Sequence, residues 1–348
     1  MGLSKGTLTF TKYRVAGPLP DNFPDFIDKQ IKLFAFSDLS TAGKEKIVGW
    51  TSFDNILDAD FEYANYSVAD YIVASLRIDR RAVPPALLKL KVLEAEKEFK
   101  EEKHLKKLFK GQREDIRETV RAGLLNRSHP VPAFYEMCWS VSGKWLLFGS
   151  LSEKVNDDFK EFFKRSFNLG VSQFMPWDPD SIPKEIPLPG REFLTWLWFR
   201  SEARGGSIMI PDRGDVEVTF LQRIVLESGE GEYSETVACR GLHADLEEGK
   251  SALRKGKKVT EARIQLGTEN TRFEFTFKAD AFCFQSLRLP VPAEEAEEDR
   301  DGRILERIYL VELAMKTMEQ LFALFLEKRL SPQWATEELP QMKKWLAD

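Results

Sequence analysis

The chain has 348 residues, of which 43% are hydrophobic and 31% charged, and its formal net charge is −5. This length exceeds what one hydrophobic core usually covers, so we expect two or three subdomains. The composition excludes a disordered chain, and the acidic balance excludes a protein coated evenly in positive charge. It still allows nucleic-acid binding through basic residues gathered on one surface.

The start of the chain lacks the charged and then apolar pattern of a secretory signal, and the longest apolar run, 321–326, is too short to span a bilayer. The three cysteines, Cys138, Cys239 and Cys283, stand singly and without metal-ligand spacing. We therefore expect buried thiols in a reducing cytoplasm, with no metal and no cofactor.

The first eighty residues are predicted to form short strands and one helix. Alternating apolar and polar residues predict strands over 5–15, 47–52 and 70–78, with Trp50 in the core. An apolar stripe with helical period follows Asp21, so we expect a helix that Asp21 caps.

Residues 83–132 are predicted to form a long helical arm, which opens at Pro84-Pro85 and ends at the prolines after His129. Twelve Lys and Arg stand against eight Asp and Glu in this segment. Its basic residues step mainly by three and four, which places most of them on one broad face. The candidate DNA-binding residues are Lys106, Lys107, Lys110, Arg113, Arg117 and Arg127. The pattern allows either a solvated helical hairpin or a basic arm laid along a phosphate backbone.

The middle of the chain is predicted to form a hairpin, a helix and a linker. The hairpin has strands over 133–141 and 144–150, and Ser152 could cap the helix that follows. Five prolines between residues 176 and 189 predict a linker and a domain boundary.

Beyond this boundary a short helix is expected over 191–206, followed by strands over 216–227 and 233–240 and a hairpin over 262–279. The acidic segment 290–302 is predicted to be a mobile loop that repels phosphate. Apolar residues at heptad spacing then predict a helix over 303–330. This helix packs either on the sheet of its own subunit or in a dimer seam.

A second basic cluster places five cations within nine residues and contains no acid. Its members are Lys250, Arg254, Lys255, Lys257 and Lys258. Gly249 and Gly256 would let the backbone approach a phosphate closely. The cluster is therefore predicted to contact DNA, with a solvated loop as the alternative.

Catalytic motifs are weak. None of the three histidines has ligand spacing, and no glycine-rich phosphate loop is present. Asp212, Asp215 and Glu217 faintly resemble a nuclease carboxylate cluster, but such sites usually need a nearby lysine, and none follows at the required spacing. A metal-dependent DNA exonuclease is therefore the alternative function, and a protein-binding scaffold without DNA affinity is a third.

Four segments together resemble the RdgC family, the bacterial recombination-associated DNA-binding proteins. These are FAFSDLSTAGKEKIVGW (34–50), LEAEKEFKEEKHLKKLFKGQREDIRETVRAGLLNR (93–127), AFYEMCWSVSGKWLLFG (133–149) and GKKVTEARIQL (256–266). The resemblance is collinear from about Leu8 to Leu330 and is weakest between Pro179 and Gly241. No single motif is diagnostic; the order and spacing of all four carry the likeness.

The resemblance implies an α+β fold of hairpin-and-helix subdomains with a long helical arm, assembled as a ring-shaped homodimer around double-stranded DNA. It further implies a non-catalytic, cytoplasmic, nucleoid-associated protein that binds without sequence preference and limits RecA action. Family members carry an aromatic residue at the fingertip after a Leu-Leu-Pro-Arg run. Here the run is Leu-Leu-Asn-Arg at 124–127 and His129 takes the place of the aromatic, so His129 is expected at the dimer contact.

These expectations divide the chain into three parts. Residues 1–82 and 133–178 are expected to form a central α+β domain. Residues 83–132 are expected to form the helical arm with its fingertip, and residues 179–348 a C-terminal α+β domain.

Overall fold

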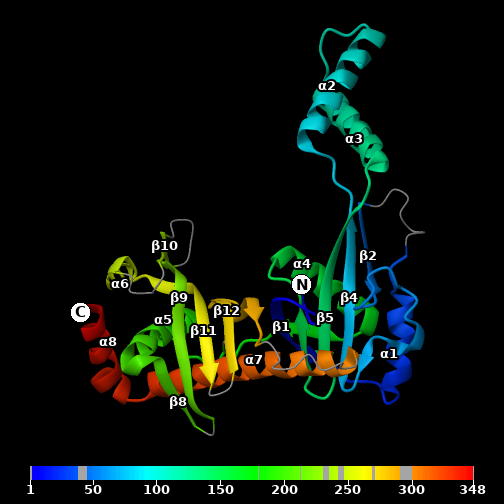
Figure 1. Cartoon of the computed structure of the whole chain (residues 1–348). Coiled ribbons are helices and arrows are strands. Elements are labelled where there is room, and N and C mark those ends of the chain that lie inside the picture. The colour runs from blue at the N-terminus through cyan, green and yellow to red at the C-terminus, as the bar shows by residue number, and fades with distance from the viewer. Residues whose placement is uncertain are drawn as a thin grey trace.

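The computed structural model describes residues 2–37, 45–178, 180–211, 213–229, 235–241, 247–268, 271–290 and 300–347. The protein has an α+β fold in which strands from the whole chain form one antiparallel sheet (Figure 1). The sheet order is β10-β9-β11-β12-β13-β1-β6-β5-β4-β2. Three further strands lie outside this order: β3 pairs with β4, β7 with β1 and β8 with β9.

The strands are β1 (Leu8–Ala16), β2 (Lys46–Thr51), β3 (Ser67–Val68), β4 (Tyr71–Arg80), β5 (Val131–Ser140), β6 (Trp145–Phe148), β7 (Gly170–Gln173), β8 (Ser207–Ile210), β9 (Gly214–Glu227), β10 (Thr236–Arg240), β11 (Lys258–Thr268), β12 (Thr271–Lys278) and β13 (Cys283–Arg288). The helices are α1 (Phe23–Leu33), α2 (Pro85–Glu102), α3 (Lys110–Arg127), α4 (Glu153–Phe167), α5 (Pro189–Glu202), α6 (Glu247–Arg254), α7 (Arg300–Leu330) and α8 (Leu339–Ala347).

Strand β1 joins two halves of the sheet. Its first residues, Leu8 and Phe10, pair with β13, whereas Thr11–Arg14 pair with β6 and Tyr13–Ala16 with β7. One hydrophobic core lies under α4, where Phe148 and Phe159 stack with ring centroids 4.0 Å apart. The other core lies under α5 and α7 and also takes in residues of β1, β4, β5 and β6. The two halves are therefore packed as one body.

Helix α7 holds the halves together, since it runs along the base of both (Figure 1). The Lys12 ammonium of β1 lies 2.6 Å from the Glu319 carboxylate, and the Tyr71 hydroxyl of β4 donates to Glu312 at 3.0 Å. The apolar residues at heptad spacing are all buried in the chain's own core: Ile304, Ile308, Val311, Met315, Met318, Phe322 and Phe325. The interpretation of α7 as packed on its own subunit is confirmed, and the dimer seam is wrong.

The helical arm continues two adjacent strands of the sheet. Strands β4 and β5 pair over ten residues each, from Tyr71↔Ser140 to Arg80↔Val131, and the chain then leaves the sheet as α2 and returns as α3. The two helices form a hairpin that stands away from the body (Figure 1). Each has 18 residues, which corresponds to about 27 Å of helix. Arg121 of α3 pairs with Glu45 at 2.8 Å, the ion pair that joins arm to body among the described residues.

Most strand and helix predictions are confirmed because they rest on local periodicity. The strands over 5–15, 47–52, 70–78 and 216–227 appear as β1, β2, β4 and β9, and both hairpins form. All three cysteines are buried thiols.

Other predictions need correction. Asp21 does not cap α1: Asn22 stands at the N-cap, its side chain donates to the Asp25 carboxylate and makes no capping bond to the backbone, and Pro24 lies in the first turn. The second basic cluster is not a loop, because α6 and the start of β11 contain most of it. Of the predicted acidic loop, residues 291–299 lie outside the described residues, and α7 begins already at Arg300.

Candidate nucleic-acid interface

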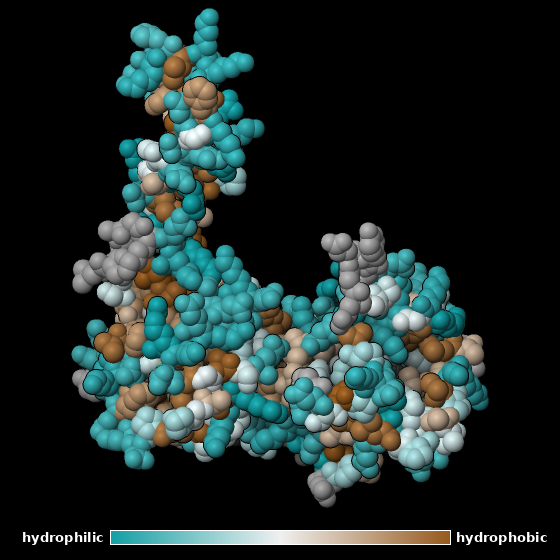
Figure 2. All heavy atoms as spheres, turned by 180° about the vertical axis from the view of Figure 1, so that it is seen from behind, coloured by the Kyte–Doolittle hydropathy of each residue, from teal (hydrophilic) through white to brown (hydrophobic). Residues whose placement is uncertain are grey.

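The arm presents a line of cations along α3. Its members are spaced by three or four residues and are all exposed: Lys110, Arg113, Arg117 and Arg121. At 100° per residue these positions fall within a sector of about 80° on the helix surface, while the acidic residues of α3 lie to one side of it. The arm surface is largely hydrophilic, with smaller hydrophobic patches, and stands clear of the body (Figure 2).

The ion pairs on this line are weak. The Lys110 ammonium lies 3.9 Å from the Glu114 carboxylate, and both side chains are more than half exposed. Arg121 and Glu45 are each 54% exposed. Exposed pairs of this kind contribute about 0 to 1 kcal/mol, so a phosphate can replace the carboxylate at little cost. Arg113 and Arg117 have no ion pair within the part of the chain that the structure describes.

Partly buried apolar residues on both helices form a thin seam between them. Leu88 and Val92 of α2 and Ile116 and Val120 of α3 are half-buried, and Leu125 is buried. The seam follows the helical period. Outside it, α3 carries mainly charged and polar residues, whereas α2 also exposes Leu87, Leu90 and Leu93. The basic residues are therefore not needed for the fold of the arm.

The reversal of the hairpin forms the tip of the arm, residues 103–113, at the upper end of Figure 1. His104 adopts a left-handed conformation with φ of +52°, which turns the chain after α2. Leu108 is buried, whereas Phe109 is 76% exposed. Lys106 and Lys107 also lie here, are exposed, and have no ion pair among the residues described.

The prediction that residues 124–130 form the fingertip is wrong, because they do not lie at the tip of the arm. Arg127 is the last residue of α3, and His129 follows in the connection to β5, at the base of the arm. Both side chains are exposed. The exposed aromatic residue at the real tip is Phe109, which sequence reasoning passed over because periodicity alone does not show where a helical hairpin reverses.

The second basic cluster is largely neutralised by acids from other segments. Lys250 is buried; its ammonium lies 3.4 Å from the Glu202 carboxylate and 5.2 Å from the centre of the Trp345 ring. Lys257 is also buried and donates to the Glu235 carboxylate at 2.8 Å.

The remaining three cations of this cluster differ in their surroundings. Arg254 is exposed and donates to the backbone oxygen of Leu346 at 2.6 Å. Lys255 is exposed and Lys258 is half-buried, and neither has an ion pair within the described residues. The expectation of five phosphate contacts is therefore corrected to two or three available cations.

The structure describes two of the three carboxylates proposed for a nuclease, Asp215 and Glu217. Asp215 accepts a hydrogen bond from the Ser207 hydroxyl at 2.9 Å, and Glu217 is exposed two residues further along β9. Asp212 lies outside the described residues. Over the described ranges, no group of three or more His, Cys, Asp or Glu side chains could hold a metal ion.

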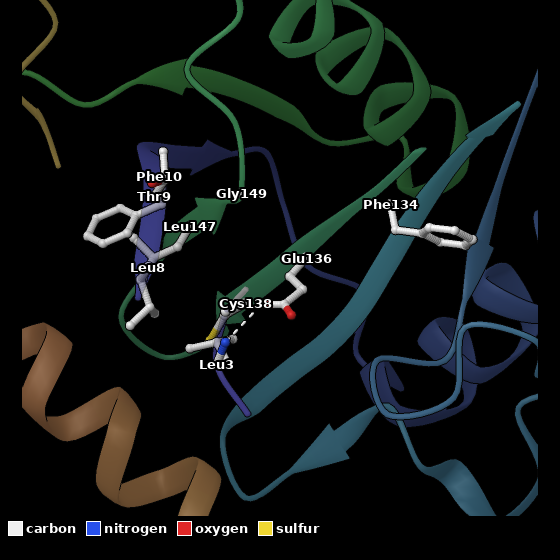
Figure 3. A pocket seen from close by; sticks show the side chains of 10 residues that line it. Leu3, Leu8, Thr9, Phe10, Phe134, Glu136, Cys138, Leu147 and Gly149 are labelled. Atoms are coloured by element: carbon white, nitrogen blue, oxygen red, sulfur yellow. Dashed lines mark hydrogen bonds between the residues drawn. The ribbon is translucent and has the colours of Figure 1, made fainter. Parts of the chain in front are cut away.

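A pocket of about 140 Å³ is lined by residues of β1, β5 and β6 and of the segment before β1 (Figure 3). Glu136 of β5 lines it and accepts a hydrogen bond from the Leu3 N–H at 2.8 Å. Burial raises the pKa of the Glu136 carboxyl, although the Leu3 N–H and Arg307 act in the opposite direction. Burial also raises the pKa of the Cys138 thiol, which keeps it protonated. The pocket therefore provides a protonatable carboxyl but no reactive nucleophile.

The chain has no match among protein-family models, and none among curated proteins. Within the described residues, no helix is both long enough and apolar enough to cross a membrane.

Proposed function

We propose that this protein binds double-stranded DNA without sequence preference and without catalysing a reaction. The observation that carries the proposal is the exposed line of cations on α3, presented on a hairpin that stands away from the body. From Lys110 to Arg121 the line covers about 16 Å of helix, which corresponds to roughly five base pairs at about 3.4 Å each. The line is thus long enough to follow one stretch of phosphate backbone.

The chemistry of this line favours non-specific binding. Lys and Arg neutralise phosphates, release counterions and carry no sequence information unless they reach base edges. The chain as a whole is acidic, with a net charge of −5, so the body repels DNA while the arm attracts it. Segregated charge of this kind orients the arm toward the duplex.

A homodimer is part of the proposal, and its support is the resemblance to the RdgC family in four segments. One arm reaches one side of a duplex, so encirclement needs a second copy of the chain. The same resemblance supports ring closure, with His129 at the dimer contact, and the limitation of RecA-driven strand exchange in the nucleoid. At the base of the arm, His129 would bring a second copy against the body rather than against the tip.

The proposal is tested by titrating the full chain into labelled duplexes of unrelated sequence at several salt concentrations. Similar affinities, which fall steeply as salt rises, are expected. A protein that leaves every duplex unbound at low salt overturns the proposal. Size-exclusion chromatography with light scattering gives the mass of the protein and so decides between a dimer and a monomer. Incubation of linear duplex with Mg²⁺ or Mn²⁺ decides the exonuclease alternative, which predicts metal-dependent loss of DNA.

A further inference from the structure

We propose that the tip of the arm binds unpaired bases, with the Phe109 ring as a stacking platform and the surrounding lysines on the phosphates. The ligand would be a single-stranded segment next to a duplex, such as a gap. This inference rests on the proposed DNA binding and adds a second kind of DNA contact at a separate place on the arm.

The Phe109 ring is free to contact a ligand because other residues fill the apolar junction at the tip. Leu108 is 7% exposed and Leu105 is half-buried, so the two leucines close the junction between α2 and α3. Phe109 is 76% exposed, more than any other aromatic side chain among the exposed large hydrophobic residues of the described chain. Its ring therefore contributes little to the hairpin core, and an exposed aromatic on a projecting end is typical of a contact surface.

The backbone holds Phe109 in a fixed position. Its N–H donates to the Gln112 side-chain oxygen at 3.0 Å, and its carbonyl accepts the Arg113 N–H at 3.2 Å. Phe109 thus forms the N-cap of α3 with extended φ of −75° and ψ of 161°. A ring with so few free torsions loses little conformational entropy when a base stacks on it.

The charge around Phe109 indicates the kind of partner. From residue 103 to residue 113 the chain carries five Lys and Arg and no Asp or Glu. Lys103 and Lys110 approach carboxylates just outside this segment at 3.6 and 3.9 Å, and all four side chains are more than half exposed. A second copy's tip would bring the same five cations into contact, which like-charge repulsion disfavours.

A nucleic-acid strand fits both features of the tip. It offers phosphates to Lys106 and Lys107 and flat base faces to Phe109. The cations also continue from the tip down α3 through Arg113 and Arg117, and this linear arrangement suits a strand that runs into a duplex. An anionic membrane would match the charge, but a single phenyl ring inserts little apolar area into it.

Unpaired bases are favoured over a closed duplex because their faces are open. In a duplex the ring would have to separate two stacked base pairs, which is costly. Removal of an aromatic platform from single-stranded binding sites typically weakens binding about 5- to 150-fold. We therefore expect at least a fivefold loss of affinity for gapped DNA when Phe109 is replaced by alanine.

The test uses the full chain and two probes of equal length, a closed duplex and the same duplex with a short thymine gap that contains 2-aminopurine. Phe109→Ala should lose affinity for the gapped probe and lose the quenching of 2-aminopurine that stacking causes. Its affinity for the closed duplex should stay within about twofold of wild type. Phe109→Trp should retain both properties. Val131→Ala is the matched control, since Val131 is 67% exposed at the base of the arm.

If wild type and Phe109→Ala bind the gapped probe equally and quench 2-aminopurine equally, the inference is overturned. The proposed binding of duplex DNA is not affected by that result. Conversion of a dimer into a monomer by Phe109→Ala, with gap binding unchanged, would assign the ring to a second copy. Loss of binding to vesicles of anionic lipid, again with gap binding unchanged, would assign it to a membrane. A wild-type protein that binds the gapped probe and ignores the duplex overturns only the proposed function, and one that binds neither overturns both.

Discussion

Lys257 and Glu235 form an ion pair in which one partner is buried and the other is open to solvent. The Lys257 ammonium donates to the Glu235 carboxylate at 2.8 Å and to the Glu235 backbone oxygen at 3.1 Å. The Lys257 side chain is 5% exposed, whereas that of Glu235 is 82% exposed. The hydrogen bond and charge of Lys257 lower the pKa of the Glu235 carboxyl. Lys257 therefore serves the fold, and a phosphate would have to displace two acceptors to reach it.

Lys257→Ala should reduce stability without changing DNA binding. The substitution removes two hydrogen bonds and empties a buried position, which should lower the free energy of unfolding by about 1 to 2 kcal/mol. Urea denaturation measures this loss. Lys255→Ala is the control, because Lys255 is exposed and should leave stability unchanged. A Lys257→Ala protein of normal stability with a lower salt slope would instead place Lys257 on the DNA surface.

Glu136 should make stability depend on pH. Burial raises the pKa of this carboxyl in the folded protein, so the folded state favours the protonated form. The resulting stabilisation is complete below the pKa of the unfolded chain and is lost as the pH rises through the higher folded-state pKa. Glu136→Gln mimics the protonated form and keeps an acceptor for the Leu3 N–H.

The measurement is the urea midpoint of wild type and Glu136→Gln between about pH 4 and pH 8. The difference should shift in favour of the Gln variant as the pH rises. Glu45→Gln, at an exposed carboxylate on the surface, is the control for a general charge effect. A difference between the two proteins that stays constant over this range contradicts the raised pKa.

Local periodicity predicts much of this fold, and long-range contacts explain where it fails. Phe273, Phe275 and Phe277 alternate with polar residues, and all three are buried on one face of β12. Such a pattern can be recognised from neighbouring residues alone, because successive side chains of a strand point to opposite faces. The buried seam of α7 follows equally from helical spacing, although the sequence does not say which surface covers it.

The candidate site is predicted less well because its charges depend on tertiary partners. Lys250 and Lys257 belong to a run without acids, yet Glu202 and Glu235 reach them from other segments. On the arm, the spacing of Arg113 and Arg117 predicts that they share one face of a helix, and in the structure they do. The position of the tip does not follow from spacing, since no proline marks the reversal after Lys103.

Gly123→Ala should stabilise the arm. Gly123 lies inside α3, and an added Cβ would meet no heavy atom within 4 Å. Alanine reduces the freedom of the unfolded chain and favours helix, which should stabilise α3 by about 0.5 to 1 kcal/mol. Slower hydrogen exchange of the α3 amides would report this gain. Gly214→Ala is the contrasting variant: it also meets open space, but its φ of +90° strains any residue with a Cβ, so stability should fall.

The arm cations should account for the salt dependence of duplex binding. Each phosphate neutralised contributes roughly 0.9 to the slope of log affinity against log salt. Arg113→Ala with Arg117→Ala should therefore weaken binding to every duplex alike and lower the slope by up to about 2. The stability of the fold should hardly change, because both side chains are exposed. The matched control is Lys343→Ala with Lys344→Ala, two exposed cations on α8 at the opposite end of the molecule. If the arm variant keeps the wild-type slope while the α8 variant lowers it, DNA lies on the far end of the body. The hairpin would then be a solvated element whose charges serve only its solubility.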